Sequence, residues 1–434
     1  MKRFLAFFSV FFFFLAPTFA DEDERIAFVN VNVITMGGDM ILEHALVVVE
    51  GGRIVSVEEN TQVKLPENVM AINGTGKYLI PGLTEMHGHI PRATRIDRDL
   101  KDLLFLYVSQ GVTTVRGMLG NAGQFKLRDK INAGEVLGPT LYLGGPSFNG
   151  NSVSSPNQAR RMVRDQVAAG WDFLKIHPGM SRAEYDAMAD EATRLGITWG
   201  GHVPADVGLE RALEAGQVTI DHLDGYEFFT GGEERDRAVQ MTLESGAAVV
   251  PTNHLWATLL GLPTRADLEA MAELKYISPE ARAQNRRRYR GQRSGNALTQ
   301  ARLDVENREI TLKALADAGA TILLGSDAPQ LYSVPGFSIH REMQAMAEAG
   351  LSPEQILTSG TSAVGEFFAD KDTFGKIAPG QRADMILLEG NPLEDISNMR
   401  SIVGVMVRGV WLSREEIDEK LAEIEARNAG WDRF

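Results

Sequence analysis

Two histidines close an apolar stretch of the chain in the arrangement Glu85-Met86-His87-Gly88-His89. Neutral imidazole is the commonest metal ligand in proteins. Because residues two apart in a β-strand point the same way, His87 and His89 can both reach one metal ion, and Gly88 lets the backbone come close. Such pairs also occur by chance in loops, so this spacing alone leaves a purely structural role equally open.

Two more histidines and an aspartate end strand-like segments farther along the chain. His202 ends the segment 198–202, and His222 ends the segment 219–222. Their separation equals one strand–helix–strand step, so we expect them on neighbouring strand ends, although each alone could be a buried core histidine. Asp327 ends the apolar run 322–327, which is typical of a strand buried on both faces. A carboxylate there requires a metal, a metal-bound water or an arginine as its partner.

Lys175 lies in another strand-like run, Phe173-Leu174-Lys175-Ile176-His177. If its side chain faces the interior, the apolar neighbours Leu174 and Ile176 face the surrounding helices. An ammonium group inside would be costly to desolvate, and nearby metal cations would repel it. Deprotonation and carboxylation by carbon dioxide would turn Lys175 into an anion that can bridge two metals. An ion pair between Lys175 and a carboxylate is the alternative.

Metal-compatible groups thus stand on five strand ends that are distant in the sequence. In a (β/α)₈ barrel, the carboxyl ends of the strands converge on one mouth, where enzymes of this fold place their chemistry. Each residue alone has an ordinary structural explanation, but their common placement favours a metal site over coincidence.

Strand-like and helix-like segments alternate from about residue 81 to 370, which is the pattern of parallel βαβ units. Helical patterns lie between most of the strands, for example over 181–195 and 209–216. This α/β pattern predicts a (β/α)₈ TIM barrel, with a doubly wound open sheet as the alternative. The eight expected strands lie near residues 82–87, 112–118, 140–145, 172–177, 197–202, 218–223, 247–252 and 321–327.

Short β-rich runs flank this middle region on both sides, in residues 21–80 and again in 371–412. We expect the two segments to form one composite β-sandwich domain beside the barrel domain of residues 81–370. The barrel carries an arginine-rich helical insertion at about 255–305. Residues 413–434 are predicted to contain an amphipathic C-terminal helix that packs on the barrel or on a partner subunit, which leaves a homo-oligomer possible.

The composition excludes several classes of function. The chain is 44% hydrophobic and has a formal net charge of −14, so a large core is available and nucleic-acid binding is disfavoured. It has no cysteine, which leaves histidine, carboxylates and modified lysine as metal ligands. Residues 1–20 predict a secretory signal peptide cleaved near Ala20. We therefore expect an exported protein, periplasmic or secreted, with no stable membrane span after cleavage.

The chain resembles the amidohydrolase superfamily, specifically its imidazolonepropionase-like and prolidase-like metal-dependent hydrolases. The resemblance covers nearly the whole mature chain. Besides the strand-end residues above, it rests on Leu79-Ile80-Pro81-Gly82-Leu83-Thr84-Glu85-Met86-His87-Gly88-His89 and on Gly375-Lys376-Ile377-Ala378-Pro379-Gly380-Gln381-Arg382-Ala383-Asp384.

The resemblance implies two divalent metal ions. His87, His89 and Asp327 would hold the more buried ion, His202 and His222 the other, and a carboxylated lysine at Lys175 would bridge them. By the same resemblance the ions are Zn²⁺, although these ligand types also accept manganese, cobalt or iron.

The implied reaction is hydrolysis of a carbon–nitrogen amide bond by a metal-activated hydroxide. Asp327 would take the water proton and return it to the leaving group. The expected substrate is a small molecule, an N-acyl amino acid or a dipeptide-like amide. The alternatives are a cyclic amide, lactone or ester hydrolase on the same metal site, or a non-catalytic protein that binds metal or ligand. Binding alone would not require a proton shuttle at the metal.

The substrate contacts are less defined. Prolidase-like relatives often follow the fifth-strand histidine with Ala-Tyr, whereas this chain has His202-Val203-Pro204, which weakens the peptidase assignment. Tyr142 or Tyr226 could supply a replacement hydroxyl, with packing as the favoured alternative, and His177 and His254 could line the mouth. Arginines of the insertion could grip a substrate carboxylate, against the favoured alternative of a solvated helix face. The arginines concerned are Arg286, Arg287 and Arg288.

Overall fold

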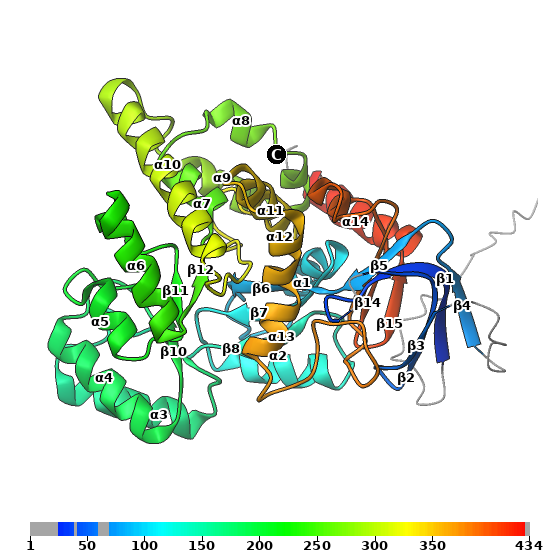
Figure 1. Cartoon of the computed structure of the whole chain (residues 1–434), viewed down its shortest axis with the longest axis horizontal. Coiled ribbons are helices and arrows are strands. Elements are labelled where there is room, and N and C mark those ends of the chain that lie inside the picture. The colour runs from blue at the N-terminus through cyan, green and yellow to red at the C-terminus, as the bar shows by residue number, and fades with distance from the viewer. Residues whose placement is uncertain (1–24, 39–40, 60–68, 430–434) are drawn as a thin grey trace, which may run out of the picture.

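The computed structural model describes residues 25–38, 41–59 and 69–429. The predicted signal peptide 1–20 with its cleavage position, and residues 430–434 of the predicted C-terminal segment, lie outside the described residues. The described chain combines sheets with covering helices, as expected for the α/β class (Figure 1). None of the helices in these ranges has the length and apolar character needed to span a bilayer.

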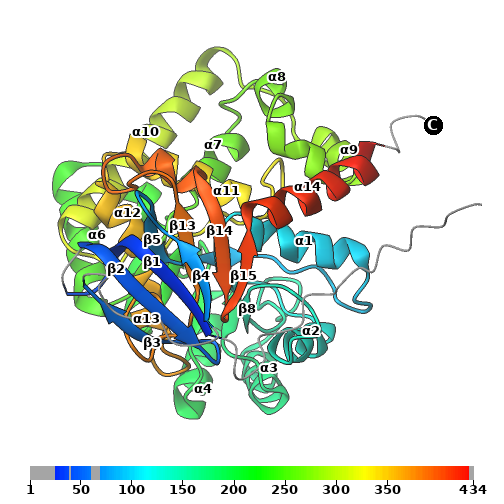
Figure 2. The same cartoon turned by 90° about the vertical axis from the view of Figure 1, so that its right-hand side faces the viewer.

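Segments from both ends of the chain share one sheet, which faces the viewer in Figure 2. Its strands are β1 (Arg25–Ile34), β2 (Ile41–Glu50), β3 (Arg53–Glu58), β4 (Val69–Asn73), β5 (Tyr78–Pro81), β13 (Met385–Leu388), β14 (Ile402–Val407) and β15 (Val410–Ser413). They follow the order β15-β14-β13-β5-β1-β2-β3, and β4 pairs with β1. Phe28, Val47 and Leu387 belong to one buried apolar cluster, so both chain ends contribute to the same core.

The strands of this sheet form a single hydrogen-bonded network. The long strand β1 is the reason. Its first half pairs with β4 from Arg25 to Val29, and its second half pairs with β5 at Asn32 and Val33. The opposite edge of β1 pairs with β2 along most of its length. One strand therefore joins groups that would otherwise form separate sheets.

The middle of the chain forms two parallel sheets. Their strands are β6 (Leu83–Gly88), β7 (Val112–Gly117), β8 (Thr140–Leu143), β9 (Leu174–Ile176), β10 (Trp199–Gly201), β11 (Thr219–Asp221) and β12 (Ala248–Val250). One sheet has the order β6-β7-β8, and the other has the order β12-β11-β10-β9. A parallel bridge between Gly144 and Phe173 connects the end of β8 to the start of β9. These seven strands lie where the sequence predicts them.

The eighth expected strand, at 321–327, lies between β12 and β6 but is not a regular strand. Ile322 forms an isolated parallel bridge with Val249, and Met86 donates its N–H to the carbonyl of Leu324 at 2.9 Å. Leu324 directs its own N–H to the carbonyl of Ser359, also at 2.9 Å. This hydrogen bond leaves the sheet, so no continuous ladder forms on this segment.

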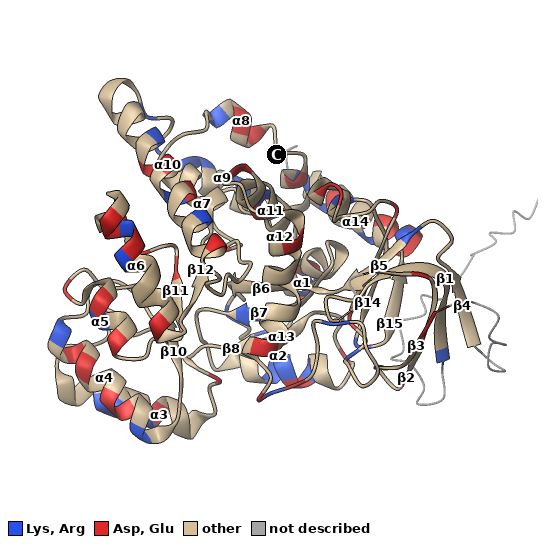
Figure 3. Cartoon of the chain, in the orientation of Figure 1, with Lys and Arg blue, Asp and Glu red and all other residues tan. Residues whose placement is uncertain are grey.

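Helices cover the parallel strands (Figure 1). They are α1 (Arg98–Ser109), α2 (Gly123–Asn132), α3 (Pro156–Ala169), α4 (Arg182–Leu195), α5 (Gly208–Glu214), α6 (Gly232–Ser245), α11 (Phe337–Glu348), α12 (Pro353–Gly360) and α13 (Ser362–Phe367). α4 begins with a capping box in which Ser181 and Glu184 bind each other's backbone N–H groups. Charged residues crowd the outer helices α3, α4 and α5, where Arg160–Asp190 and Arg211–Asp186 ion pairs connect neighbouring helices (Figure 3).

The insertion after β12 is helical, as predicted, and longer than predicted. It comprises α7 (Asn253–Leu259), α8 (Arg265–Glu269), the 3₁₀ helix η2 (Ala272–Tyr276), α9 (Pro279–Arg288) and α10 (Gly295–Asp317). Another 3₁₀ helix, η1 (Tyr226–Phe228), precedes α6. The C-terminal helix α14 (Arg414–Ala429) packs against η2, α1 and the β14–β15 edge (Figure 2). A third 3₁₀ helix, η3 (Ile396–Arg400), precedes β14.

Candidate metal centre

Three of the predicted ligands meet where β6 and the 321–327 segment end. His87, His89 and Asp327 each offer one ligand atom, and these atoms lie within 4.8 Å of one another. Nε2 of His89 is 2.7 Å from Oδ1 of Asp327, and Nε2 of His87 is 3.8 Å from the same oxygen. Side chains that are some 240 positions apart in the sequence thus converge on one point.

The imidazoles of His202 and His222 continue this group. The ring centre of His222 is 4.4 Å from that of His87 and 4.4 Å from that of His202. Nε2 of His222 lies 3.8 Å from Oδ2 of Asp327. His177 adds a further ring, 5.1 Å from His202, so this predicted substrate contact does border the imidazole cluster.

Lys175 completes the set of six predicted ligands. Its side chain is fully buried, and its Nζ is 3.2 Å from Nε2 of His87. Burial lowers the pKa of Lys175 to about 8, against the opposing effect of Asp221 and Asp327. Gly201 makes room for it on the neighbouring strand, because a Cβ there would lie 3.1 Å from Nζ and 2.6 Å from the carbonyl oxygen of Ile176. The backbone of Gly201 also has a φ of +122°, which side chains rarely tolerate.

Two of the imidazoles are hydrogen-bonded at Nδ1 to a second side chain, and Nδ1 of a third, His87, lies next to a carboxylate without hydrogen-bond alignment. Nδ1 of His87 is 2.7 Å from Oδ2 of Asp221. Nδ1 of His202 is 2.6 Å from Oδ2 of Asp224. Nδ1 of His222 is 2.7 Å from Oγ1 of Thr252. Where Nδ1–H donates a hydrogen bond to such a partner, Nε2 carries the free lone pair, which is the usual arrangement around metal-binding histidines. The partner residues are Asp221, Asp224 and Thr252.

Electrostatics keep the most buried imidazoles neutral. Burial lowers the pKa of both His87 and His222 well below the ordinary value, and the charge of Lys175 adds to this effect at both rings. Neutral imidazole is the form that binds a metal.

The unsatisfied atoms of the site fit a cation. Within the described part of the chain, Nε2 of His222 and Oδ1 of Asp327 are buried and make no hydrogen bond. Buried polar atoms without partners are rare and costly. Oδ1 of Asp327 approaches Nε2 of His89 to 2.7 Å without hydrogen-bond alignment, as two ligands of one ion would. Nitrogen and carboxylate oxygen atoms are ligands that zinc and similar divalent ions accept.

A buried carboxylate connects the two strand ends behind this group. Oε1 of Glu85 accepts the N–H groups of His87 at 3.0 Å and of Ser326 at 2.7 Å, and Oε2 accepts the hydroxyl of Ser326 at 2.5 Å. Burial raises the pKa of Glu85 to about 8. Ser326 directly precedes Asp327 in the chain. Glu85 therefore holds together the backbone that carries His87 and the backbone that carries Asp327.

Asp221 is in turn accompanied by a buried arginine. Arg116 on β7 is 1% exposed, and its Nη1 lies 3.9 Å from Oδ2 of Asp221. Its Nη2 donates to Oγ1 of Thr219 at 3.0 Å, and its guanidinium lies 4.6 Å from the ring centre of Phe173. A buried guanidinium requires an anion nearby, and Asp221 supplies it.

Positive φ angles mark the backbone of this site. His222, Thr252 and Asp327 have φ values of 66°, 51° and 59°, in the left-handed region. Such angles are uncommon outside glycine and persist only where the surrounding structure holds them. They turn these side chains away from the directions that a regular strand would give.

Two other predicted substrate contacts, Tyr142 and Tyr226, pack against side chains outside the imidazole cluster, and a third, His254, lies at the start of α7. The ring of Tyr142 stacks on Phe368 at 4.0 Å within an apolar cluster. The hydroxyl of Tyr226 is buried against Oγ1 of Thr242 at 2.6 Å. Burial lowers the pKa of His254 to about 4, and the charges that act on it are those of Arg341, Glu273 and Arg400. Both tyrosines therefore follow the packing alternative, and neither replaces the carbonyl-assisting tyrosine of prolidase-like relatives.

Arg286, Arg287 and Arg288 are exposed on α9, as expected for a solvated helix face. Arg288 differs from Arg286 and Arg287 because it lines a pocket of about 730 Å³. Pro91 and Pro329 line the same pocket, and each lies two residues beyond a member of the His89–Asp327 group. None of the six candidate ligands lines this pocket, whose wall includes Pro91 and Pro329 and extends to α9 and α14.

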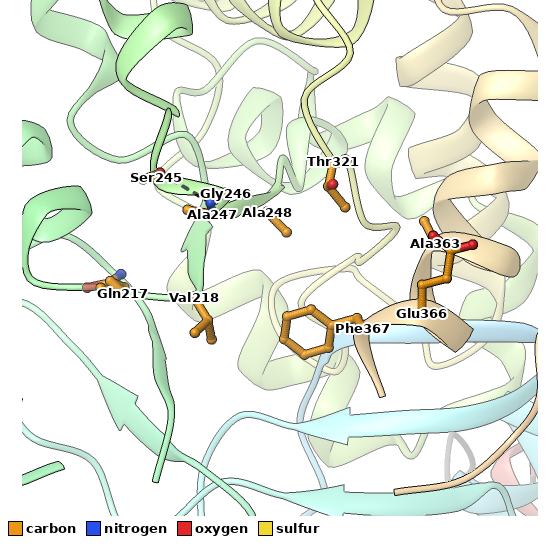
Figure 4. Close-up of a pocket in the computed structure, with 11 residues that line it drawn as sticks. Gln217, Val218, Ser245, Gly246, Ala247, Ala248, Thr321, Ala363, Glu366 and Phe367 are labelled. Atoms are coloured by element: carbon orange, nitrogen blue, oxygen red, sulfur yellow. Dashed lines mark hydrogen bonds between the residues drawn. The ribbon is translucent and has the colours of Figure 1, made fainter. Parts of the chain in front are cut away.

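A second pocket, of about 370 Å³, lies at the other end of the strands (Figure 4). It is lined by Val218 and Ala248 at the amino ends of β11 and β12, together with Thr321 and Phe367. The imidazoles follow the carboxyl ends of the same strands, so this pocket is separate from the candidate metal centre.

Comparisons with known proteins agree with this chemistry. The model of the amidohydrolase family matches residues 78–412. An imidazolonepropionase from Streptomyces griseus is 22% identical over 395 residues, covering 87% of this chain and 93% of that protein. Among solved structures, a bottromycin amidohydrolase superposes with a TM-score of 0.73 at 23% identity, covering 93% of this chain and 90% of its own.

A Xaa-Pro dipeptidase with bound methionine superposes with a TM-score of 0.70 at 20% identity, covering 90% of this chain and all of that one. At these identities the structural likenesses concern the fold. The family match spans most of the sequence, from β5 to β15, and includes every strand end that carries a candidate ligand. The chain belongs to the amidohydrolase family and is a hydrolase of carbon–nitrogen bonds.

Proposed function

We propose that the chain is a binuclear metal-dependent amidohydrolase that cleaves the amide bond of an N-acyl amino acid or a dipeptide-like substrate. The observation that carries this proposal is the convergence of six side chains, in which Nδ1 of His202 and of His222 is hydrogen-bonded and Nδ1 of His87 lies 2.7 Å from a carboxylate oxygen. The six are His87, His89, Lys175, His202, His222 and Asp327. Family membership supports hydrolysis of a carbon–nitrogen bond, and the linear amide substrate is our proposal within that class.

We infer that the parallel strands close into a (β/α)₈ barrel. The support is a series of backbone contacts between consecutive neighbours: the bridge from β8 to β9, the bridge from β12 to Ile322, and the hydrogen bond between Met86 and Leu324. In this arrangement all candidate ligands lie at one mouth. The sheet of residues 21–80 and 371–412 would then form a second domain beside the barrel of residues 81–370.

In this proposal His87, His89 and Asp327 hold one divalent ion, and His202 and His222 hold the other. Zinc suits a set dominated by imidazole. Bound ions would supply Lewis acidity, which acidifies water and polarises the substrate carbonyl.

Lys175 would lie between the two ions as a carbamate. Its Nζ is next to Nε2 of His87, where an ammonium group would repel a divalent ion. The neutral amine forms an N–C bond with carbon dioxide and releases one proton, which leaves an anionic carboxylate with two oxygen atoms. The interior position of Lys175 and the space left by Gly201 support this assignment.

Asp327 is the proposed proton carrier. It is 4% exposed, and its two oxygen atoms face imidazoles on different strand ends. A carboxylate in this position can accept the proton of the attacking water and pass it to the leaving nitrogen. The 730 Å³ pocket, which begins at Pro91 and Pro329, would hold the substrate body, with Arg288 available for a carboxylate.

Hydrolysis of a substrate panel tests this proposal. The panel contains N-acyl amino acids, dipeptides, cyclic amides, lactones and esters, and release of product is followed with and without a chelator. We expect amino-acid release from linear amides, its loss after chelation and its return with added zinc. Asp327→Asn should retain most of the metal and lose at least about a hundredfold in kcat. Full activity in that variant, or chelator-insensitive turnover, would rule out the mechanism, and turnover of the cyclic substrates alone would rule out the substrate class.

A further inference from the structure

Arg308 connects the helical insertion to the strand ends beside the metal centre. It lies on α10, and its guanidinium donates to three acceptors in the two segments that follow β11 and β12. Nη1 donates to the carbonyl of His222 at 2.7 Å, Nη2 to the carbonyl of Pro251 at 2.9 Å, and Nε to Oδ1 of Asn253 at 3.2 Å. The first acceptor ends β11, and the other two follow β12. One planar group therefore spans two neighbouring strand ends.

The surroundings of Arg308 hold the guanidinium in this position. Its central carbon lies 4.8 Å from the ring centre of Trp256. Glu342, which is fully buried, accepts the N–H groups of Asn253 and His254, both at 2.8 Å, and so fixes the start of α7. Burial lowers the pKa of Arg308 only to about 10, so the group stays charged at neutral pH.

The backbone that Arg308 grips is the part that needs support. His222 and Thr252 both have positive φ angles, which the chain adopts only when its surroundings favour them. Thr252 holds Nδ1 of His222, and it lies between the two residues, Pro251 and Asn253, that Arg308 binds. The guanidinium thus fixes both the carbonyl of His222 and the loop that orients its ring.

We propose that Arg308 is a positioning residue of the metal centre. Its three hydrogen bonds keep the Nε2 atom of His222 directed at the site, so the insertion helix α10 is a required part of metal binding. This inference rests on the proposed function, because it takes His222 as a metal ligand. The planar fork is essential, since a lysine ammonium cannot serve three acceptors in these directions.

Metal binding by matched variants tests the inference. Arg308→Lys retains the charge and loses the fork, and Arg308→Met removes both. Leu312→Ala is the control, because Leu312 is fully buried on the same helix and makes none of these hydrogen bonds. Each metal-free protein is titrated with zinc against a chromophoric chelator, bound zinc is counted by elemental analysis, and the Tm of the metal-free form is recorded.

We expect both Arg308 variants to bind the weaker of two zinc ions about ten- to hundredfold less tightly while keeping the tighter one. Leu312→Ala should lower the Tm with both zinc affinities close to wild type. Wild-type zinc affinity in Arg308→Lys would overturn the proposal. A loss of zinc affinity in Leu312→Ala that accompanies its lower Tm would overturn it too, because zinc binding would then follow general stability. If the wild-type protein binds a single zinc ion, the binuclear function is contradicted, and the variants are compared by their affinity for that ion. If the wild-type protein binds no zinc, both the proposed function and the role of Arg308 are overturned. If Arg308→Met does not fold, Arg308→Lys decides.

Discussion

Replacing Asp221 by alanine measures how much the orientation of His87 contributes to metal binding. Oδ2 of Asp221 lies 2.7 Å from Nδ1 of His87, and neither side chain is more than 1% exposed. Removing such a partner typically weakens metal binding about ten- to a hundredfold, or about 1.4–2.8 kcal/mol. Asp221→Ala should therefore raise the Kd of the tighter zinc ion by that factor.

The same substitution also removes the carboxylate beside Arg116. Breaking a buried ion pair costs about 3–5 kcal/mol because one charge stays behind without compensation. The separation of 3.9 Å and the remaining hydrogen bond to Thr219 favour the lower end of that range, about 3 kcal/mol. Asp221→Asn removes the charge but keeps an oxygen atom beside Nδ1 of His87. We expect it to lose similar stability while its zinc affinity stays within about threefold of wild type.

Two measurements separate these effects. Urea unfolding of the metal-free proteins gives the free energy of unfolding, and competition with a chromophoric chelator gives the zinc affinity. The double variant Arg116→Met/Asp221→Ala should recover much of the stability of Asp221→Ala and none of its zinc affinity. The reasoning would be refuted if Asp221→Asn and Asp221→Ala lost zinc affinity equally, or if neither lost any.

Three further predictions concern other parts of the molecule. Lys175→Ala should lose one of two bound zinc ions, and added acetate or formate should restore part of the lost zinc occupancy. Two zinc ions per chain in this variant by elemental analysis would contradict the carbamate bridge. Arg288→Met should raise KM about tenfold for substrates with a free carboxylate but not for their neutral amides. Arg287→Met is the control, because Arg287 does not line the pocket. Equal changes of KM in the two variants would exclude a contact between Arg288 and the substrate carboxylate. Burial lowers the pKa of His340 in the folded protein to about 3, whereas in the unfolded chain this pKa is near 6.5. On acidification the unfolded chain therefore binds the proton first. The contribution of neutral His340 to the free energy of unfolding is complete above pH 6.5 and is lost as the pH falls toward 3. At pH 5 this loss is about 2 kcal/mol. In urea unfolding, the free energy of unfolding of His340→Met should therefore fall by about 2 kcal/mol less between pH 7 and pH 5 than that of the wild type. An equal fall in both proteins would contradict the prediction.

The parts of the fold that depend on local alternation could be predicted from the sequence. The seven strands β6 to β12 fall at their expected places because each is a short apolar run followed by a helical pattern. The irregular eighth segment could not be predicted, since Leu324 directs its N–H to Ser359, a residue outside the sheet. The matching β-rich runs at both ends of the chain led us to expect that they combine, but no local pattern indicates how β1 divides its edge between β4 and β5.

The candidate ligands could be predicted because each occupies a strand end. The groups that orient them could not. Asp221 and Asp224 stand next to His222 in the sequence, but they serve different histidines, His87 and His202. That assignment follows from the positive φ of His222, which breaks the strand alternation at this point. Arg308 was beyond prediction because it acts from a helix that the alternation of strands does not include.

The antiparallel contact of β5 with β13 has a consequence for synthesis of the chain. Pro81 pairs with Met385, so one edge of β5 has no partner until some 300 further residues have been made. At ordinary translation rates of about 5–20 residues per second, this interval is roughly 15–60 s. During that time the nascent chain presents an open strand edge, which is a template for pairing with other chains. Binding by a chaperone that covers extended apolar segments would be most effective in this interval, before the last strands emerge.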